Sequence, residues 1–223
     1  MSDKNYRWFT FIASLFVTTL IISNIIAVKL LSIWGFIIPA GVILFPITYI
    51  VGDILTEVYG YARARQVIWI GFLCNLIAVG AIWLAGVLPA AAFWKMDEAY
   101  GSILGFAPRL LLASFVAYLF GEFLNSYILA KLKIKTKGKH LWSRTIGSTV
   151  VGQGADSAIF IVIAFSGVMP AEALLATILS QWAIKVSYET LATPMTYFAV
   201  NKLKKIEQVD HFDSDTNFNP IGK

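Results

Sequence analysis

The sequence predicts an all-α membrane protein, a bundle of six transmembrane helices with both termini in the cytoplasm. Of the 223 residues, 58% are hydrophobic and only 14% are charged, a balance that a soluble domain reaches only by exposing large apolar patches. The chain also contains six long apolar segments, and most of its basic residues lie between alternate segments. A spanning helix needs roughly 20 apolar residues, so six spans with their loops use almost the whole chain.

The six apolar segments are residues 8–31, 33–59, 66–88, 109–130, 146–168 and 172–200. The first is too long for a signal-peptide core and no small-residue cleavage site follows it, so we expect it to remain as the first helix. We therefore expect one transmembrane domain over residues 1–205. Residues 206–223 are expected to form a disordered cytoplasmic tail, because residues 210–223 are polar and have no apolar periodicity.

The basic residues determine the predicted orientation. They concentrate in the N-terminal tail, the second loop, the fourth loop and the C-terminal tail, which share one side of the membrane only if the number of spans is even. The opposite side has only Lys95 and Arg109. By the positive-inside rule, both termini lie in the cytoplasm.

The second apolar segment is expected to be irregular. It contains Gly35, Pro39, Gly41, Pro46 and Gly52, which favour a broken helix or a re-entrant segment before a regular helix. Freed backbone groups are tolerated in a membrane where they are buried in protein or line a cavity. The segment is therefore either a cavity wall or a helix with a simple kink.

Seven ionisable residues remain inside the predicted spans. A central Asp, Lys or Arg costs roughly 2.5–3.5 kcal/mol on insertion scales, so seven of them are expected to face one another or a polar cavity and not lipid. Five are acids and two are bases, an imbalance that favours a bound ligand. The seven are Lys29, Asp53, Glu57, Glu122, Asp156, Lys185 and Glu189.

Their spacing and depth suggest how they pair. Glu122 and Asp156 lie near the centres of the fourth and fifth segments. Lys185 and Glu189 are four residues apart, so a local ion pair is expected between them. Asp53 and Glu57 share a helix face by the same spacing.

Two further features of the spans leave alternatives open. Glu57 either joins the buried group or lies at the membrane interface near Arg63. Tyr49, Trp182 and Tyr188 either stack on a planar ligand or belong to the aromatic belts of membrane helices.

The sequence lacks the motifs of most enzyme classes, including the P-loop, H-E-x-x-H and G-x-S-x-G patterns. His140 and His211 lie in the fourth loop and the tail, away from the spans, and the single Cys74 excludes an internal disulfide or a zinc cluster. We expect no enzyme activity, no cofactor, no metal and no nucleic-acid partner. The lipid bilayer surrounds the chain, which is either a monomer or a dimer.

Motifs along residues 24–197 resemble those of the queuosine precursor transporter family, also called the vitamin uptake transporter family, and in particular its YhhQ-like branch. The matching residues are Asn24…Lys29…Pro39…Pro46…Asp53-x-x-x-Glu57-x-Tyr59-Gly60, Gly121-Glu122-x-x-Asn125, Trp142-x-Arg144, Asp156-Ser157 and Lys185-x-x-Tyr188-Glu189…Pro194. Their joint order over six spans makes the resemblance specific.

The resemblance implies a transporter of the bacterial inner (plasma) membrane. It would import 7-cyano-7-deazaguanine and, as an open alternative, 7-aminomethyl-7-deazaguanine for queuosine modification of tRNA. A guanine-like edge offers two donors to a carboxylate and a carbonyl to an amide or lysine. We therefore predict Asp53, Glu122, Asp156 and Glu189 as acceptors, Lys29 and Lys185 as donors or charge partners, and Asn24, Asn125 and Gln153 as amide contacts.

Two mechanisms remain open at this point. One is a secondary carrier whose central site faces each side of the membrane in turn. The other is a substrate-binding subunit of a vitamin or nucleobase uptake system that needs a separate energising complex. The source of energy, by protons, another ion or facilitated diffusion, is also undecided by the sequence.

Overall fold

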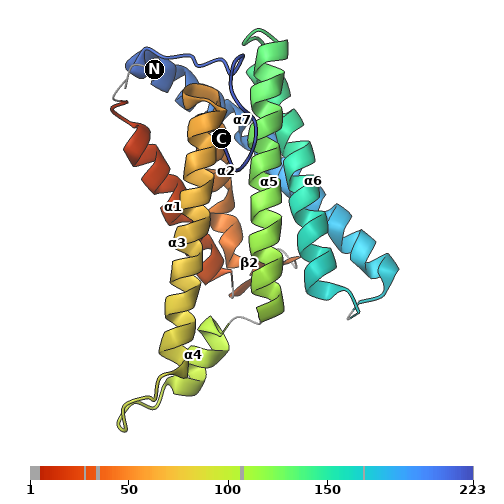
Figure 1. The fold of residues 1–223 in the computed structure, drawn as a ribbon. Helices are drawn as coiled ribbons and strands as arrows, with labels where there is room; N and C mark the ends of the chain where they lie inside the picture. The colour runs from red at the N-terminus through yellow and green to blue at the C-terminus, as the bar shows by residue number, and fades with distance from the viewer. Residues whose placement is uncertain (1–5, 28, 34–35, 106–107, 168, 223) are drawn as a thin grey trace.

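The computed structural model describes residues 6–27, 29–33, 36–105, 108–167 and 169–222. These residues form an all-helical fold with one short β-hairpin (Figure 1). In chain order the elements are α1 (Phe9–Ile26), β1 (Leu30–Ile33), β2 (Phe36–Pro39), the 3₁₀ helix η1 (Ala40–Ile43), α2 (Phe45–Tyr59), α3 (Tyr61–Val87), α4 (Asp97–Leu104), α5 (Pro108–Lys135), α6 (Leu141–Phe165) and α7 (Ala171–Glu207).

Four of the helices, α1, α3, α5 and α6, are long and apolar enough to cross a membrane. Large apolar side chains point outward along them: Leu73, Ile77 and Trp83 on α3 are between 55% and 68% exposed. Such a surface is stable in lipid and not in water. The α2 helix has only 15 residues, and α7 has 37.

The expected break in the second apolar segment is present. Instead of one helix, the chain forms strand β2, which pairs antiparallel with β1, then η1, and only then α2. Pro46 lies in the first turn of α2, where its missing N–H has no helical acceptor to lose. Pro39 ends β2 and Gly41 lies in η1, while Gly35 falls outside the described residues.

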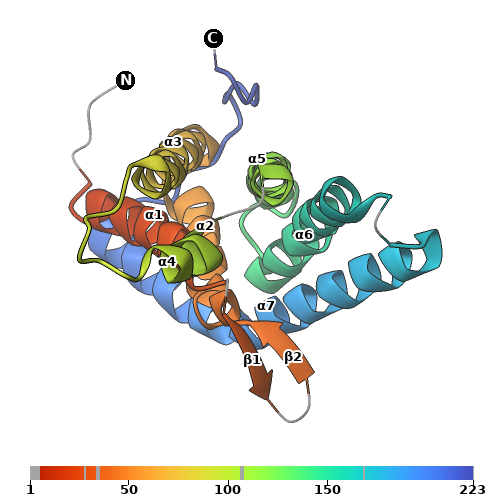
Figure 2. The ribbon, with the colours of Figure 1, turned by 90° about the horizontal axis from the view of Figure 1, so that it is seen from below.

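The helices pack in two groups joined by α7 (Figure 2). Helices α1, α2 and α3 contact one another, and α5 packs along most of its length on α6. The long α7 crosses obliquely and contacts both α6 and α2. This arrangement brings polar residues from six helices toward a common space.

The start of α1, the end of α2, the start of α3 and the end of α7 meet at one end of the bundle. Glu207, the last residue of α7, accepts hydrogen bonds from the backbone N–H groups of Arg7 and Trp8 at 3.1 and 2.7 Å. A carboxylate at this position satisfies amide groups that have no partner within α1 and complements the helix dipole. Among the basic residues of the predicted tails, Lys4 and Lys223 fall outside the described residues.

The C-terminal segment differs from the expected disordered tail. Residues 208–222 lie against α3 and α5, and Asp213 is buried where it accepts hydrogen bonds from the N–H of Tyr61 at 3.0 and 3.1 Å. The Phe218 ring lies 5.0 Å from that of Tyr61 and under the Lys131 ammonium. The composition of the segment does not reveal these contacts, because its partners are remote in the sequence.

Candidate functional site

A cavity of about 380 Å³ lies between the two helix groups. Its size falls in the range of small-molecule sites, and its walls are mainly apolar with a few polar groups. Five of the predicted site residues line it: Asn24 on α1, Glu122 on α5, Gln153 and Asp156 on α6, and Lys185 on α7. Helices α2 and α3 complete the wall with Tyr49 and Asn75.

The one ion pair in the described lining joins Lys185 to Asp156 across α7 and α6. The expected local pair between Lys185 and Glu189 is therefore wrong. The spacing of four residues allowed that pair, but Lys185 points into the cavity while Glu189 is completely buried and does not line it. An ion pair between two helices forms only when the fold brings them together, and the sequence spacing does not reveal it.

Glu122 is the other charged group of the cavity, and it makes no hydrogen bond or ion pair with the described residues. Its side chain lies against α2, where Oε2 is 3.5 Å from the position that a Cβ atom on Gly52 would occupy. The glycine thus leaves room for the carboxylate. Because Glu122 is only 8% exposed, a ligand with hydrogen-bond donors would satisfy a carboxylate that water reaches poorly.

Amide side chains form the polar part of the opposite wall. Asn24 donates from Nδ2 to Oδ1 of Asn75 at 3.2 Å, which links α1 to α3. Gln153 is 4% exposed, and its Oε1 has no hydrogen-bond partner among the described residues. Amides of this kind supply both donors and acceptors to a ligand.

Aromatic side chains supply flat apolar surface to the cavity. Tyr49, Phe115, Tyr118 and Phe160 line it. Two of the aromatic residues considered from sequence do not: the Trp182 indole donates to the carbonyl of Val150 at 2.8 Å, and Tyr188 is 41% exposed on the outer surface.

The other predicted site residues lie away from the lining. Asn125 donates from Nδ2 to Oδ1 of Asp53 at 2.9 Å, in a buried position beside the cavity. Glu189 is buried near them, and its charge acts on Asp53. Lys29 is exposed at the start of the hairpin and does not line the cavity.

The close approach of α5 and α6 sets the position of several cavity residues. A Cβ atom on Gly152 would lie 2.7 Å from Cβ of Asn125 and 2.9 Å from the carbonyl oxygen of Gly121. A Cβ atom on Gly121 would lie 2.8 Å from Cβ of Asp156. Glycine at both positions therefore allows backbone contact, as at small-residue interfaces of membrane helices.

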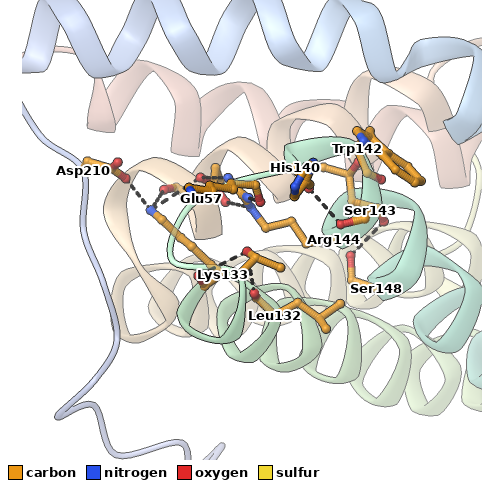
Figure 3. A network of polar contacts seen from close by, with 12 residues as sticks. Glu57, Leu132, Lys133, His140, Trp142, Ser143, Arg144, Ser148 and Asp210 are labelled. Carbon is orange, nitrogen blue, oxygen red and sulfur yellow. Dashed lines mark hydrogen bonds and ion pairs between the residues drawn. The ribbon is translucent and has the colours of Figure 1, made fainter.

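Glu57 belongs to a separate cluster of charges at the end of the bundle where the chain termini lie (Figure 3). Arg144 binds both carboxylate oxygens of Glu57 at 2.7 Å in a bidentate pair, and Lys204 binds Oε1 at 2.6 Å. Lys133 bridges the buried carboxylate to Asp210 in the C-terminal segment at 2.6 Å. We call Glu57, Lys133, Arg144, Lys204 and Asp210 the terminal charge cluster.

Glu57 is fully buried within this cluster and does not pair with Arg63, which stacks on the Tyr6 ring. Within the cluster, burial by itself would raise the pKa of Asp210. The hydrogen bonds and charges of Lys133 and Lys204 outweigh burial and hold that pKa below its ordinary value.

The sequence alone assigned no role to Asn75, which lines the cavity, or to Arg144, which binds Glu57 in the terminal charge cluster. Asn75 is the one strongly polar side chain between Gln66 and the end of the third apolar segment, a signal that was available. Arg144 lies between the fourth and fifth apolar segments, and no local pattern points to its partner Glu57, which lies 87 residues earlier in the chain.

The fold and the cavity define a class: helical membrane proteins with a cavity of small-molecule size between their helices. The chain belongs to the family described as "Putative vitamin uptake transporter", whose model matches residues 39–199. Membership of a transporter family confirms the predicted relationship and agrees with the expectation that the chain is not an enzyme.

The curated relatives carry a more specific name. A "Probable queuosine precursor transporter" from Bacillus subtilis (strain 168) is 29% identical over 187 residues, 83% of this chain and 82% of that protein. The "Queuosine precursor transporter" of Escherichia coli (strain K12) is 26% identical over 165 residues, 73% of this chain and 69% of that protein. No solved structure matches the chain significantly.

Proposed function

We propose that this chain imports queuosine precursor bases, with 7-cyano-7-deazaguanine as a substrate and 7-aminomethyl-7-deazaguanine as a second candidate. The names of the relatives support the substrate class. The observation that carries the proposal is the unpaired Glu122 carboxylate in a cavity that also holds amides and aromatic rings.

The chemistry of the base matches this set of groups. Glu122 would accept hydrogen bonds from N1–H and the exocyclic amine of a guanine-like edge, and an amide such as Gln153 would donate to its carbonyl. Tyr118 or Phe160 would stack on the ring system, for roughly 1–3 kcal/mol per base by analogy with single-stranded nucleic-acid sites. Of the predicted contacts, we assign substrate binding to the cavity residues Asn24, Glu122, Gln153, Asp156 and Lys185.

We further propose six spans, formed by α1, α2 with its preceding hairpin, α3, α5, α6 and α7, in the bacterial inner membrane. The basic residues at the end of the bundle where the termini lie favour the cytoplasm for that end. A fluorescent protein fused after residue 223 is expected to fluoresce in cells. A fused alkaline phosphatase that is active instead would contradict this orientation.

The transport proposal is tested with the purified chain in liposomes. Counterflow of labelled 7-cyano-7-deazaguanine is expected in the wild type. Glu122→Gln is expected to weaken binding about 10- to 100-fold, because the new amide group opposes the donors of the base and loses about 1–3 kcal/mol. Asp156→Asn is expected to reduce counterflow by releasing Lys185.

Glu172→Gln, an exposed change at the start of α7, is the matched control and should transport normally. Wild-type counterflow in both cavity variants would rule out the proposed site. Binding of the base without any counterflow by the wild-type chain would instead favour a binding subunit that needs an energising complex.

A further inference from the structure

A buried group of acceptor atoms lies beside the cavity and is not explained by base binding. It consists of Asp53 on α2, Asn125 on α5 and Glu189 on α7, which are 1%, 7% and 0% exposed. Helix α2 packs on both α5 and α7, Asn125 binds Asp53 directly, and the charge of Glu189 acts on Asp53. None of them lines the cavity.

The hydrogen bonds of this group are incomplete. One bond joins Asn125 Nδ2 to Asp53 Oδ1. Asp53 Oδ2, Asn125 Oδ1 and both carboxylate oxygens of Glu189 have no hydrogen-bond partner among the described residues. All four atoms are acceptors in the ionised state, so they cannot bond to one another, and each buried unsatisfied group costs about 1–3 kcal/mol.

The charges around the group have the wrong sign to neutralise it. The groups whose charges act on Asp53 are Glu189 from α7, Glu122 from α5 and Glu57 one turn further along α2. Lys185 on α7 is engaged by Asp156 from α6. The cations of the terminal charge cluster are held by Glu57 and Asp210.

The charges of Asp156, Glu122 and Glu189 also act on Tyr49 of α2. The neutral hydroxyl of this tyrosine brings no positive charge. Among the residues that the structure describes, no cation therefore compensates Asp53 and Glu189. Two carboxylates that share a low-dielectric site cannot both remain ionised at little cost.

We propose that Asp53 and Glu189 form a proton-binding site that couples base uptake to the proton gradient. One bound proton converts a carboxylate oxygen into an O–H donor and removes one negative charge. When one of the four orphaned atoms carries the proton, the other three remain as acceptors for the new donor.

A short connection links this site to the cavity. Asn125, which binds Asp53, lies three residues after Glu122 on α5, so the two side chains share a helix face. The Glu122 carboxylate also lies beside Gly52, the residue before Asp53, where Oε2 is 3.5 Å from the position that a Cβ atom on Gly52 would occupy. Loss or gain of a proton therefore changes the field and packing at the carboxylate to which we assign the base. The inference rests on the proposed function and adds its source of energy: the proton enters with the base and leaves to the cytoplasm.

The experiment uses the full chain in liposomes with a pH-sensitive dye inside. With one proton per base, an imposed gradient of one pH unit, acidic outside, is expected to support about ten-fold accumulation of 7-cyano-7-deazaguanine, accompanied by acidification of the lumen. Asp53→Asn and Glu189→Gln are expected to abolish the accumulation and the acidification while counterflow persists. Asp97→Asn and Glu172→Gln, which alter exposed acids, are the matched controls.

Wild-type counterflow without any accumulation of the base under the pH gradient would overturn this inference and leave the proposed function intact. A sodium gradient that drives accumulation in place of the proton gradient would also overturn it, as would gradient-driven accumulation in both variants. Absence of any counterflow in the wild type would contradict the proposed function itself.

An infrared measurement tests the site without transport. The wild-type chain near neutral pH is expected to show the C=O stretching band of a protonated carboxylic acid in a buried environment. Asp53→Asn or Glu189→Gln should remove or shift this band, and Asp97→Asn should not. A wild-type spectrum without the band at any pH at which the protein is folded would overturn the proposal, even if a variant fails to fold.

Discussion

Individual charged residues in this protein are held by partners far away in the sequence. Glu57 is the clearest case, because it is fully buried and receives Arg144 from α6 and Lys204 from α7. Removing one member of such a buried cluster is costly, since the remaining charges lose their compensation. The cluster also joins the C-terminal segment through Asp210, so its effect reaches beyond one helix.

We expect Glu57→Gln to destabilise the folded protein by about 3–5 kcal/mol, because Lys133, Arg144 and Lys204 would keep their charges around a neutral amide. Thermal unfolding in detergent measures the effect as a lower Tm. Glu98→Gln, at an exposed acid of α4, is the matched control and should unfold like the wild type. Equal Tm values for Glu57→Gln and the wild type would show that the cluster contributes nothing to stability.

Helices α5 and α6 approach each other closely beside the cavity. Gly121 and Gly152 face each other there, and the residues that follow them on the same helices, Glu122 and Gln153, line the cavity. A small change in helix separation would therefore move polar groups on both walls. The geometry of the site therefore depends on glycine, which has no Cβ atom, at both of these positions.

We expect Gly152→Ala to cost about 1–3 kcal/mol of stability, because the added Cβ would lie 2.7 Å from Cβ of Asn125 and the helices would have to separate. Base binding should weaken with it, as measured by equilibrium binding in detergent. Gly80→Ala on α3 has open space around its Cβ and should change neither property. An equal effect of both substitutions would mean that loss of glycine, and not the α5–α6 contact, is responsible.

At the scale of the whole molecule, the C-terminal segment ties helices together at one end. Asp213 accepts the N–H of Tyr61 at the start of α3, and Arg65 donates to the carbonyls of Asn217 and Asn219 at 3.0 and 2.6 Å. Upstream of it, Glu207 binds the start of α1. Acidic side chains thus satisfy the free amides of two helices, although the segment itself has no regular structure.

We expect Asp213→Ala to release residues 208–222 from α3, with a loss of about 1 kcal/mol, as for other helix-capping residues. Hydrogen exchange should then accelerate at the start of α3 and along the C-terminal segment. Asp215→Ala, two residues further along at an exposed position, is the control and should leave the exchange unchanged. Unchanged exchange in Asp213→Ala would show that the segment is held by its other contacts alone.

The sequence by itself determined the membrane class, the family, the break before α2 and the charged residues that line the cavity. These follow from local properties: apolar length, the helix-breaking effect of Pro and Gly, and the cost of ionisable groups in lipid. Only the tertiary structure decided which charges meet, because ion pairs such as Lys185 with Asp156 and Arg144 with Glu57 join different helices. It also separated the nine predicted contacts into residues that line the cavity and others, such as Asp53 and Glu189, that are buried beside it. The physical reason is that the rotation and packing of the helices set the direction of each side chain.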